Sequence, residues 1–315
     1  LNSRHNILIA IAIELLKAIK GMTKVLVTGG SGFLGKNLKK ENPEWVYISS
    51  SDCNLLSRQE IKQTLSFYKP ESVLHLAGIV GGIKENSLKQ GEFFYKNVCM
   101  NTNILEAARQ MKIQRVLSCL STCAFPDVVD EYPFSEESIF DGPPAKTNFS
   151  YGYAKRMLHV QSQAYRKQYG LNYSTFCPSN LYGPEDCYDE NKSHFVPALI
   201  RKIYDAKDGD SVEFWGTGKP LRQQLYVKDL VEIIPKLINL HNSFEPLLVT
   251  PNENLSIHDM IFLAKSITNK NIKVEYNNEL EGQHRKDGSN KKMTELIGDY
   301  DFTSFREGFK ETYDW

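Results

Sequence analysis

The sequence lacks an excess of charge of either sign, since 38 Lys and Arg residues balance 38 Asp and Glu residues. It also lacks a cluster of basic residues of the kind that lines a nucleic-acid surface. Nucleic acid is therefore not expected as a partner, and an anionic ligand must be met by a few local positive groups.

Long apolar runs are missing as well. The run at residues 7–13 is far shorter than the roughly 20 apolar residues that cross a bilayer. Lys17, Lys20 and Lys24 follow it, where a secretory signal would have a small-residue cleavage site. We expect no membrane association, treat residues 1–21 as an N-terminal extension outside the fold, and take Met22 as a more natural start.

Cysteine is sparse and not arranged for metal binding. None of the six cysteines forms a Cys-x-x-Cys pair or a cluster with zinc-ligand spacing. No metal is therefore expected, and free thiols in a reducing compartment, the cytoplasm, are the simplest interpretation. The six are Cys53, Cys99, Cys119, Cys123, Cys177 and Cys187.

What is present is a regular alternation of strand and helix patterns. Strand patterns cover residues 24–27, 45–48, 72–76, 115–120 and 173–178. Helical patterns run to about residue 40 and over 61–67, 92–111 and 151–169. Such alternation predicts βαβ units and an α/β fold with a doubly wound parallel sheet of the Rossmann type.

The 315 residues favour one large domain carrying a smaller one. We assign residues 22–182 to the dinucleotide-binding domain, with 225–252 returning to it as a helix (225–240) and a last strand (246–250). Residues 183–224 and 253–315, which are shorter elements and a polar, lysine-rich segment, are assigned to a smaller C-terminal substrate-binding lobe.

A glycine-rich loop joins the first strand to the first helix. Glycines there let backbone N–H groups approach a pyrophosphate at the positive end of a helix. The spacing Gly-x-x-Gly-x-x-Gly is typical of short-chain dehydrogenases/reductases. The cofactor-binding candidates are Gly29, Gly30, Ser31, Gly32, Phe33, Leu34 and Gly35.

The choice between NAD and NADP is left open by these residues. An acidic residue after the second strand would bind the ribose hydroxyls and repel a 2′-phosphate. Asp52 could be that residue, or it could belong to the turn that follows. No arginine clamp for a phosphate is evident.

A polar loop, Ser121 to Cys123, follows the fourth strand, and Tyr151 and Lys155 open the next long helix. Tyr and Lys four apart share one helix face. A lysine ammonium should lower the pKa of the tyrosine, which would make Tyr151 a general acid for a carbonyl that accepts hydride. Ser121 would be a second hydrogen-bond donor.

Seven segments together resemble the extended short-chain dehydrogenases/reductases and, among them, the GDP-L-fucose synthase family. The resemblance covers residues 22–315. The segments are residues 28–35, 75–83, 120–126, 151–155, 178–184, 193–199 and 215–222.

This resemblance implies an NADP-dependent enzyme that epimerises C3 and C5 of GDP-4-keto-6-deoxy-D-mannose and then reduces C4, giving GDP-L-fucose. It implies Cys123 as the base and His194 as the acid of epimerisation, beside Ser121, Tyr151 and Lys155. Lys155 is expected to lower the pKa of the Cys123 thiol.

The family also implies the remaining binding residues. The GDP-sugar would be held by Lys202, Trp215, Arg222 and Glu281, the last standing where relatives have an Asp before glycine. Helices 92–111 and 151–169 would pair into a four-helix homodimer contact. Further cofactor contacts would come from Leu76, Ala77, Tyr151, Lys155, Pro178, Ser179, Asn180, Leu181 and His194.

Two alternatives stay open. An NAD-dependent sugar-nucleotide 4-epimerase or dehydratase would share the fold but has no use for Cys123 and His194 as a pair. A non-catalytic dinucleotide sensor would have no need of Ser121, Tyr151 and Lys155.

Overall fold

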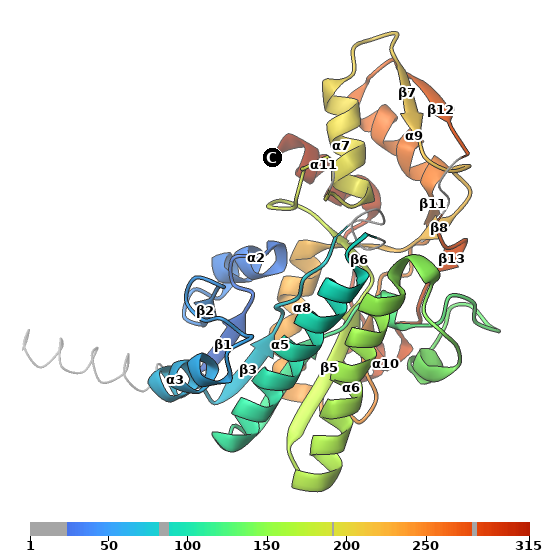
Figure 1. Cartoon of the computed structure of the whole chain (residues 1–315). Coiled ribbons are helices and arrows are strands. Elements are labelled where there is room, and N and C mark those ends of the chain that lie inside the picture. Colours follow the sequence, from blue (N-terminus) through green and yellow to red (C-terminus); the bar gives the residue numbers. More distant parts are fainter. Residues whose placement is uncertain (1–23, 82–87, 191, 279–281) are drawn as a thin grey trace, which may run out of the picture.

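A six-stranded parallel sheet forms the centre of the computed structural model, which describes residues 24–81, 88–190, 192–278 and 282–315 (Figure 1). Its strand order is β10-β5-β4-β3-β1-β2, and all neighbours are parallel. The predicted doubly wound sheet is thus confirmed. Its strands are β1 (Val25–Thr28), β2 (Val46–Ile48), β3 (Ser72–His75), β4 (Arg115–Cys119), β5 (Asn172–Pro178) and β10 (Leu247–Val249).

Helices cover both faces of this sheet because its buried strands present apolar side chains on alternate sides. In β1, Leu26 joins the cluster under one set of helices, whereas Val25 and Val27 join the cluster on the opposite face. The first set is α3 (Arg58–Tyr68), α5 (Gln90–Gln110) and α6 (Phe149–Tyr169). The second set is α2 (Phe33–Glu41), α8 (Val227–Leu240) and α10 (Lys291–Ile297).

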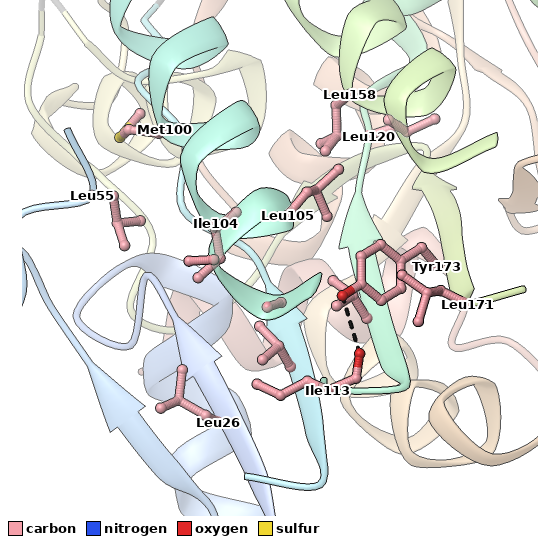
Figure 2. Close-up of a cluster of buried hydrophobic side chains, with 14 of the residues drawn as sticks. Leu26, Leu55, Met100, Ile104, Leu105, Ile113, Leu120, Leu158, Leu171 and Tyr173 are labelled. Carbon is pink, nitrogen blue, oxygen red and sulfur yellow. Dashed lines mark hydrogen bonds between the residues drawn. The ribbon is translucent and has the colours of Figure 1, made fainter. Parts of the chain in front are cut away.

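Figure 2 shows part of the first cluster, with side chains of α5 and α6 packed over the strands. The Tyr173 hydroxyl, fully buried, donates to the Ile113 carbonyl at 3.1 Å. Burying such a ring adds apolar contact, and the hydrogen bond satisfies its polar end. The predicted long helices at 92–111 and 151–169, observed as α5 and α6, build this core together with α3.

A second body of structure lies beyond the sheet (Figure 1). A third buried cluster holds it together, with Leu199, Phe214, Met260 and Phe305 among its members. Its helices are α7 (Phe195–Asp205), α9 (Ile257–Thr268) and α11 (Phe305–Asp314), around the parallel pair β7 (Ser211–Phe214) and β12 (Lys273–Tyr276).

Short strands and turns connect the two bodies. A three-stranded sheet contains β8 (Leu221–Arg222), β11 (Leu255–Ser256) and β13 (Arg285–Lys286), and a two-stranded one contains β6 (Asn180–Tyr182) and β9 (Gln224–Tyr226). The 3₁₀ turns are η1 (Thr122–Ala124), η2 (Glu136–Phe140) and η3 (Lys146–Asn148).

The helix predicted at 225–240 begins two residues later, at Val227. Leu225 and Tyr226 are buried in β9, where they pair with Leu181 and Tyr182 of β6. Strand pairing between distant segments overrides a local helical pattern here. Among the described helices, none combines the length and the apolar composition that a bilayer crossing demands.

Candidate active site

The glycine loop and the end of β3 meet where the strand order reverses, between β1 and β3. The Ala77 N–H donates to the Thr28 hydroxyl at 3.2 Å. Gly29 has φ +76°, and a Cβ built on it would lie 2.9 Å from the Ala77 nitrogen. Only glycine fits this close approach. The structure thus brings Leu76 and Ala77 to the predicted nucleotide loop, at the crevice where such sheets bind ligands.

The loop runs directly into the N-terminus of α2. Gly35 packs so tightly that a Cβ there would lie 2.8 Å from the Gly30 Cα. Gly32 is the N-cap and offers no side-chain cap, and the first turn carries no acidic residue. The partial positive charge of the helix end is therefore unopposed, so this cradle suits a pyrophosphate.

Asp52 belongs to the turn after β2. Its Oδ2 accepts hydrogen bonds from the Ser49 backbone N–H at 2.8 Å and from the Ser49 hydroxyl at 2.6 Å. These bonds lower the pKa of the carboxyl, so Asp52 is ionised at neutral pH. Of its two possible roles, the structure shows the one within the turn.

The loop after β4 is held firmly against α6. Ser121 is the N-cap of η1, and its Oγ accepts the Cys123 N–H at 3.2 Å. The buried Arg156 of α6 donates to the Ala124 carbonyl at 2.5 Å and to the Gly142 carbonyl at 2.7 Å. These bonds place the side chains of Ser121 and Cys123 relative to the helix that carries Tyr151.

Tyr151 and Lys155 are both buried, as one face of α6. The Lys155 ammonium lies 5.8 Å from the centre of the Tyr151 ring and donates to the Cys119 carbonyl at 2.8 Å. Burial, together with nearby thiols, raises the pKa of Tyr151 well above its ordinary value, although a hydrogen bond with Ser121 opposes this.

The expectation of a lowered tyrosine pKa is therefore wrong. Burial disfavours the charged phenolate and is the largest influence on the pKa of Tyr151. Burial likewise lowers the pKa of Lys155. The consequence favours proton donation: the Tyr151 phenol stays protonated at neutral pH, as a general acid must.

Cys123 contacts a cation that the sequence-based reasoning did not single out. The Lys286 ammonium lies 3.3 Å from the Cys123 sulfur. Burial raises the pKa of the thiol, but the charge of Lys286, a hydrogen bond with Ser121 and the charge of Arg222 outweigh it, so the net pKa is lowered. The prediction that Lys155 does this is corrected, because Lys286 is the cation in contact and the larger influence.

His194 stands at the N-cap position of α7, and its side chain makes no capping hydrogen bond. Desolvation by the surrounding protein, followed by the charge of Lys286, lowers its pKa. The imidazole is therefore neutral at pH 7. Lys286 thus acts electrostatically on both Cys123 and His194, which come from different elements.

The segment after β5 borders Tyr151. Pro178 ends the strand, Ser179 is buried, and Asn180 and Leu181 lie in β6. The Ser179 backbone N–H donates to the Val249 carbonyl at 3.1 Å, and its hydroxyl has no hydrogen-bond partner among the described residues. A buried hydroxyl in this state is available to a ligand.

The predicted substrate residues fall into two groups. Arg222 lies in β8 in register with Lys286 of β13, and its charge acts on Cys123. Lys202 instead lies on α7, where its ammonium donates to the Glu213 carbonyl at 2.5 Å and sits 5.0 Å from the centre of the Phe214 ring. Trp215 follows β7 and is 54% exposed.

Glu281 lies outside the described residues. The next residue, Gly282, lies close to Arg222, which is predicted to bind the substrate. A Cβ on Gly282 would lie 3.1 Å from Nη2 of Arg222.

Gly152 is a second residue that the sequence-based reasoning left without a role. A Cβ on Gly152 would overlap the Cys123 carbonyl oxygen and lie 2.7 Å from the Pro144 Cβ. This glycine lets α6 touch the turn that carries Cys123. The sequence offered one indication of this packing role, namely that Gly152 lies between Tyr151 and Tyr153.

Replacing Gly152 by Ala is expected to separate these elements. Because the obstacle is backbone, the change should destabilise the fold by about 1–3 kcal/mol and impair every activity of the site. Thermal unfolding measures the first effect. Gly91→Ala is the matched control, since a Cβ there meets nothing within 4 Å in helix α5 and should stabilise the fold slightly. Equal unfolding temperatures for Gly152→Ala and the wild type would contradict the packing argument.

Comparisons with known proteins agree with this geometry. The model of the NAD dependent epimerase/dehydratase family matches residues 25–247. A GDP-L-fucose synthase of Dictyostelium discoideum is 37% identical, with 92% of this chain and 94% of the relative covered. A probable GDP-L-fucose synthase of Drosophila melanogaster is 34% identical over 93% of this chain and 97% of its own length.

Solved structures give the same result. A GDP-L-fucose synthetase of Naegleria fowleri bound to NADP superimposes with a TM-score of 0.84 at 32% identity, covering 93% of this chain and 94% of that one.

Proposed function

The chain belongs to the NAD dependent epimerase/dehydratase family and, within it, to the GDP-L-fucose synthases, and we propose that it converts GDP-4-keto-6-deoxy-D-mannose to GDP-L-fucose with NADPH. It is an oxidoreductase with epimerase activity. The observation that carries the proposal is the Cys123 thiol, 3.3 Å from a lysine ammonium and beside the Ser121, Tyr151 and Lys155 set. A simple carbonyl reductase has no use for such a thiol.

Epimerisation uses the acidity of the C–H bonds next to the 4-keto group. The Cys123 thiolate removes the proton from C3 or C5, and the C–H electron pair moves into the carbonyl to form an enolate. Ser121 and Tyr151 hold the enolate oxygen by hydrogen bonds. The protonated form of His194, a minor species at neutral pH because its pKa is lowered, then delivers a proton to the opposite face of the carbon, which inverts it.

Reduction follows at the same carbonyl. Bound NADPH supplies the hydride to C4. The Tyr151 phenol, protonated because its pKa is raised, gives its proton to the developing alkoxide, and Ser121 orients the oxygen. Lys155, which donates to the Cys119 carbonyl, would help to hold the cofactor when it is bound.

The residues present fit NADP. The loop Gly29–Gly35 and the N-terminus of α2 would hold the pyrophosphate, and Leu76 and Ala77 would line the adjoining wall. The segment from Pro178 to Leu181, with the free Ser179 hydroxyl, would border the nicotinamide, as would His194.

The GDP part of the substrate would lie on the smaller lobe, assigned to residues 183–224 and 253–315 apart from α10, which packs against the central sheet. It would face the dinucleotide-binding part, assigned to residues 22–182 and 225–252. Arg222 can bind pyrophosphate oxygens through two parallel N–H groups. Lys202 and Trp215, near one end of β7, would meet the rest of the nucleotide, together with Glu281.

The proposal is tested by adding GDP-4-keto-6-deoxy-D-mannose to the protein and following oxidation of NADPH, then of NADH, with product stereochemistry read by NMR. Oxidation of NADPH with formation of GDP-L-fucose is the expected result. Consumption of neither cofactor would overturn the assignment. Conversion of a sugar nucleotide at C4 without net cofactor use would favour the 4-epimerase alternative.

A homodimer is part of the proposal. Helices α5 and α6 lie side by side on the outer face of the sheet (Figure 1). Their outward residues include Tyr95, 64% exposed, and Met157 and Val160, 44% and 48% exposed. Phe149, Tyr153, Met157 and Val160 form one apolar stripe at helical spacing on α6. A second copy related by a two-fold axis would cover this face with the same helices.

Val160→Glu is expected to convert the dimer to monomer, because two carboxylates would be buried near the axis. Light scattering at micromolar concentration measures this change. Phe67→Glu is the control, since Phe67 is 79% exposed on α3, away from the stripe, and should leave the mass unchanged. A wild-type monomer would refute the dimer.

We also place the protein in the cytoplasm. All six cysteines are free, which suits a reducing compartment. Fractionation of cells expressing the tagged chain would test this location.

A further inference from the structure

Lys286 is the one described cation with a hydrogen bond to the Cys123 sulfur, at 3.3 Å, although 163 residues separate the two in sequence. It lies in β13, which pairs in parallel with β8 so that Lys286 stands opposite Arg222. The contact joins the C-terminal segment to the turn after β4. It therefore ties the short sheet that connects the two bodies to the loop that carries Cys123.

The backbone around Lys286 is held on several sides. Gln223 bonds both backbone groups of Gly288, accepting from its N–H at 2.9 Å and donating to its carbonyl at 3.1 Å. The Phe134 N–H donates to the Asp287 carbonyl at 2.9 Å, and the Ser289 N–H donates to the Phe134 carbonyl at 2.8 Å. Gln283 donates to the Asp127 carbonyl at 2.6 Å.

These bonds tie the segment to the chain that follows Cys123. A Cβ on Gly288 would lie 3.1 Å from the side chains of both Leu248 and Phe134, so the segment also packs closely. A lysine on such a rigid support keeps its charge over the sulfur, whereas a surface lysine would swing into solvent.

The other ionisable groups that act on Cys123 divide by sign. Tyr151 of α6 and Cys177 of β5 oppose a negative charge on the sulfur, while Lys155 of α6 and Arg222 of β8 favour it. His194 of α7 experiences the charge of Lys286 as well. Direct contact makes Lys286 the leading favourable group, because electrostatic attraction falls with distance.

We propose that Lys286 is a positioning residue that holds Cys123 as a thiolate, ready to remove the sugar proton. This rests on the proposed function only for the identity of the reaction. The thiolate lone pair forms the S–H bond as the C–H pair enters the enolate, and the thiol later releases that proton to solvent. Lys286 exchanges no proton with the sugar.

The first test uses the protein without substrate. Alkylation of Cys123 by iodoacetamide is measured against pH in the wild type, Lys286→Gln, Lys286→Arg and Lys291→Gln. Fragmentation of the labelled peptide separates Cys123 from Cys119, which lie between the same two tryptic sites. Lys291, an exposed lysine five residues further on, is the matched control.

For Lys286→Gln, alkylation near neutral pH should slow on the order of tenfold, with its pH midpoint moved upward. Lys286→Arg, which keeps the charge, should recover most of the rate, and Lys291→Gln should match the wild type. An unchanged midpoint in a Lys286→Gln protein that unfolds at the wild-type temperature would overturn the proposal.

The second test separates thiol activation from substrate binding. Solvent deuterium uptake at C3 and C5 is followed with saturating GDP-4-keto-6-deoxy-D-mannose. Lys286→Gln should lower kcat for exchange and move both limbs of its pH profile upward, since the charge bears on Cys123 and His194 alike.

A rise in KM alone, with unchanged alkylation, would overturn the thiol role and make Lys286 a substrate contact only. If the wild type turns over no GDP-sugar, the proposed function fails while the alkylation result still decides the role of Lys286.

Discussion

Cys123→Ser is expected to abolish inversion at C3 and C5 while leaving the carbonyl reducible, so that the product is a C4-reduced, unepimerised sugar. A hydroxyl is a far weaker acid than a thiol, and the charges that lower the thiol pKa do not bring an alcohol into the neutral range. Solvent deuterium uptake should fall by about 10²–10⁴-fold, the usual contribution of a positioned base.

NMR of the product reports both the deuterium content and the stereochemistry. Cys187→Ser is the matched control, because Cys187 is exposed and no function is assigned to it. Undiminished exchange in Cys123→Ser would remove the thiol from the mechanism. It would then favour the alternative in which a tightly held NAD takes hydride from C4 and returns it.

Tyr151→Phe is expected to stop hydride transfer, with NADPH oxidation slowed about 10²–10⁴-fold for want of the proton donor. The ring is retained in its buried place, so the unfolding temperature should change little. Deuterium exchange should slow less, because Ser121 still donates to the enolate oxygen. Tyr153→Phe is the control, since Tyr153 lies two residues away and its ring contacts with Phe149 and Arg156 need no hydroxyl.

The pH dependence gives an independent check of the same residue. A general acid loses activity as the pH rises through its pKa. Because burial places the pKa of Tyr151 well above the ordinary tyrosine value, NADPH oxidation by Cys123→Ser, which is expected to reduce C4 without epimerisation, should hold constant into alkaline pH. A decline that begins near neutrality would contradict the protonated phenol and restore the lowered pKa expected from Lys155 alone.

The variants also address the non-catalytic alternative. A dinucleotide sensor would bind NADPH but would not oxidise it, whichever keto sugar is added. Turnover by the wild type that disappears in Tyr151→Phe, with cofactor binding intact, is incompatible with that alternative.

Much of the fold of this protein can be predicted from its local sequence. Short apolar runs and helical patterns predict the strands and helices of the parallel sheet, because strands buried on both faces are apolar throughout, whereas helices buried on one face follow a period of 3.6 residues. The glycine spacing at 29–35 predicts a loop in which the backbone must approach closely. The structure agrees, since the Ala77 backbone excludes a Cβ at Gly29. Tyr151 and Lys155 share a face by helical geometry alone.

Only the tertiary structure decided the electrostatics of the site. Tyr151 and Lys155 are four residues apart in any helix, but whether the pair lowers or raises the tyrosine pKa depends on burial, which the fold sets. Lys286 is one of 38 basic residues, and although the nearby Glu281 is predicted to bind the substrate, nothing in the sequence pairs Lys286 with Cys123. Its contact with Cys123 arises because β13 pairs with β8 and the neighbouring backbone is tied to the loop after β4. Hydrophobic periodicity is local, so it can be read along the chain. A charge acts through space, so its partner is known only when the chain has folded.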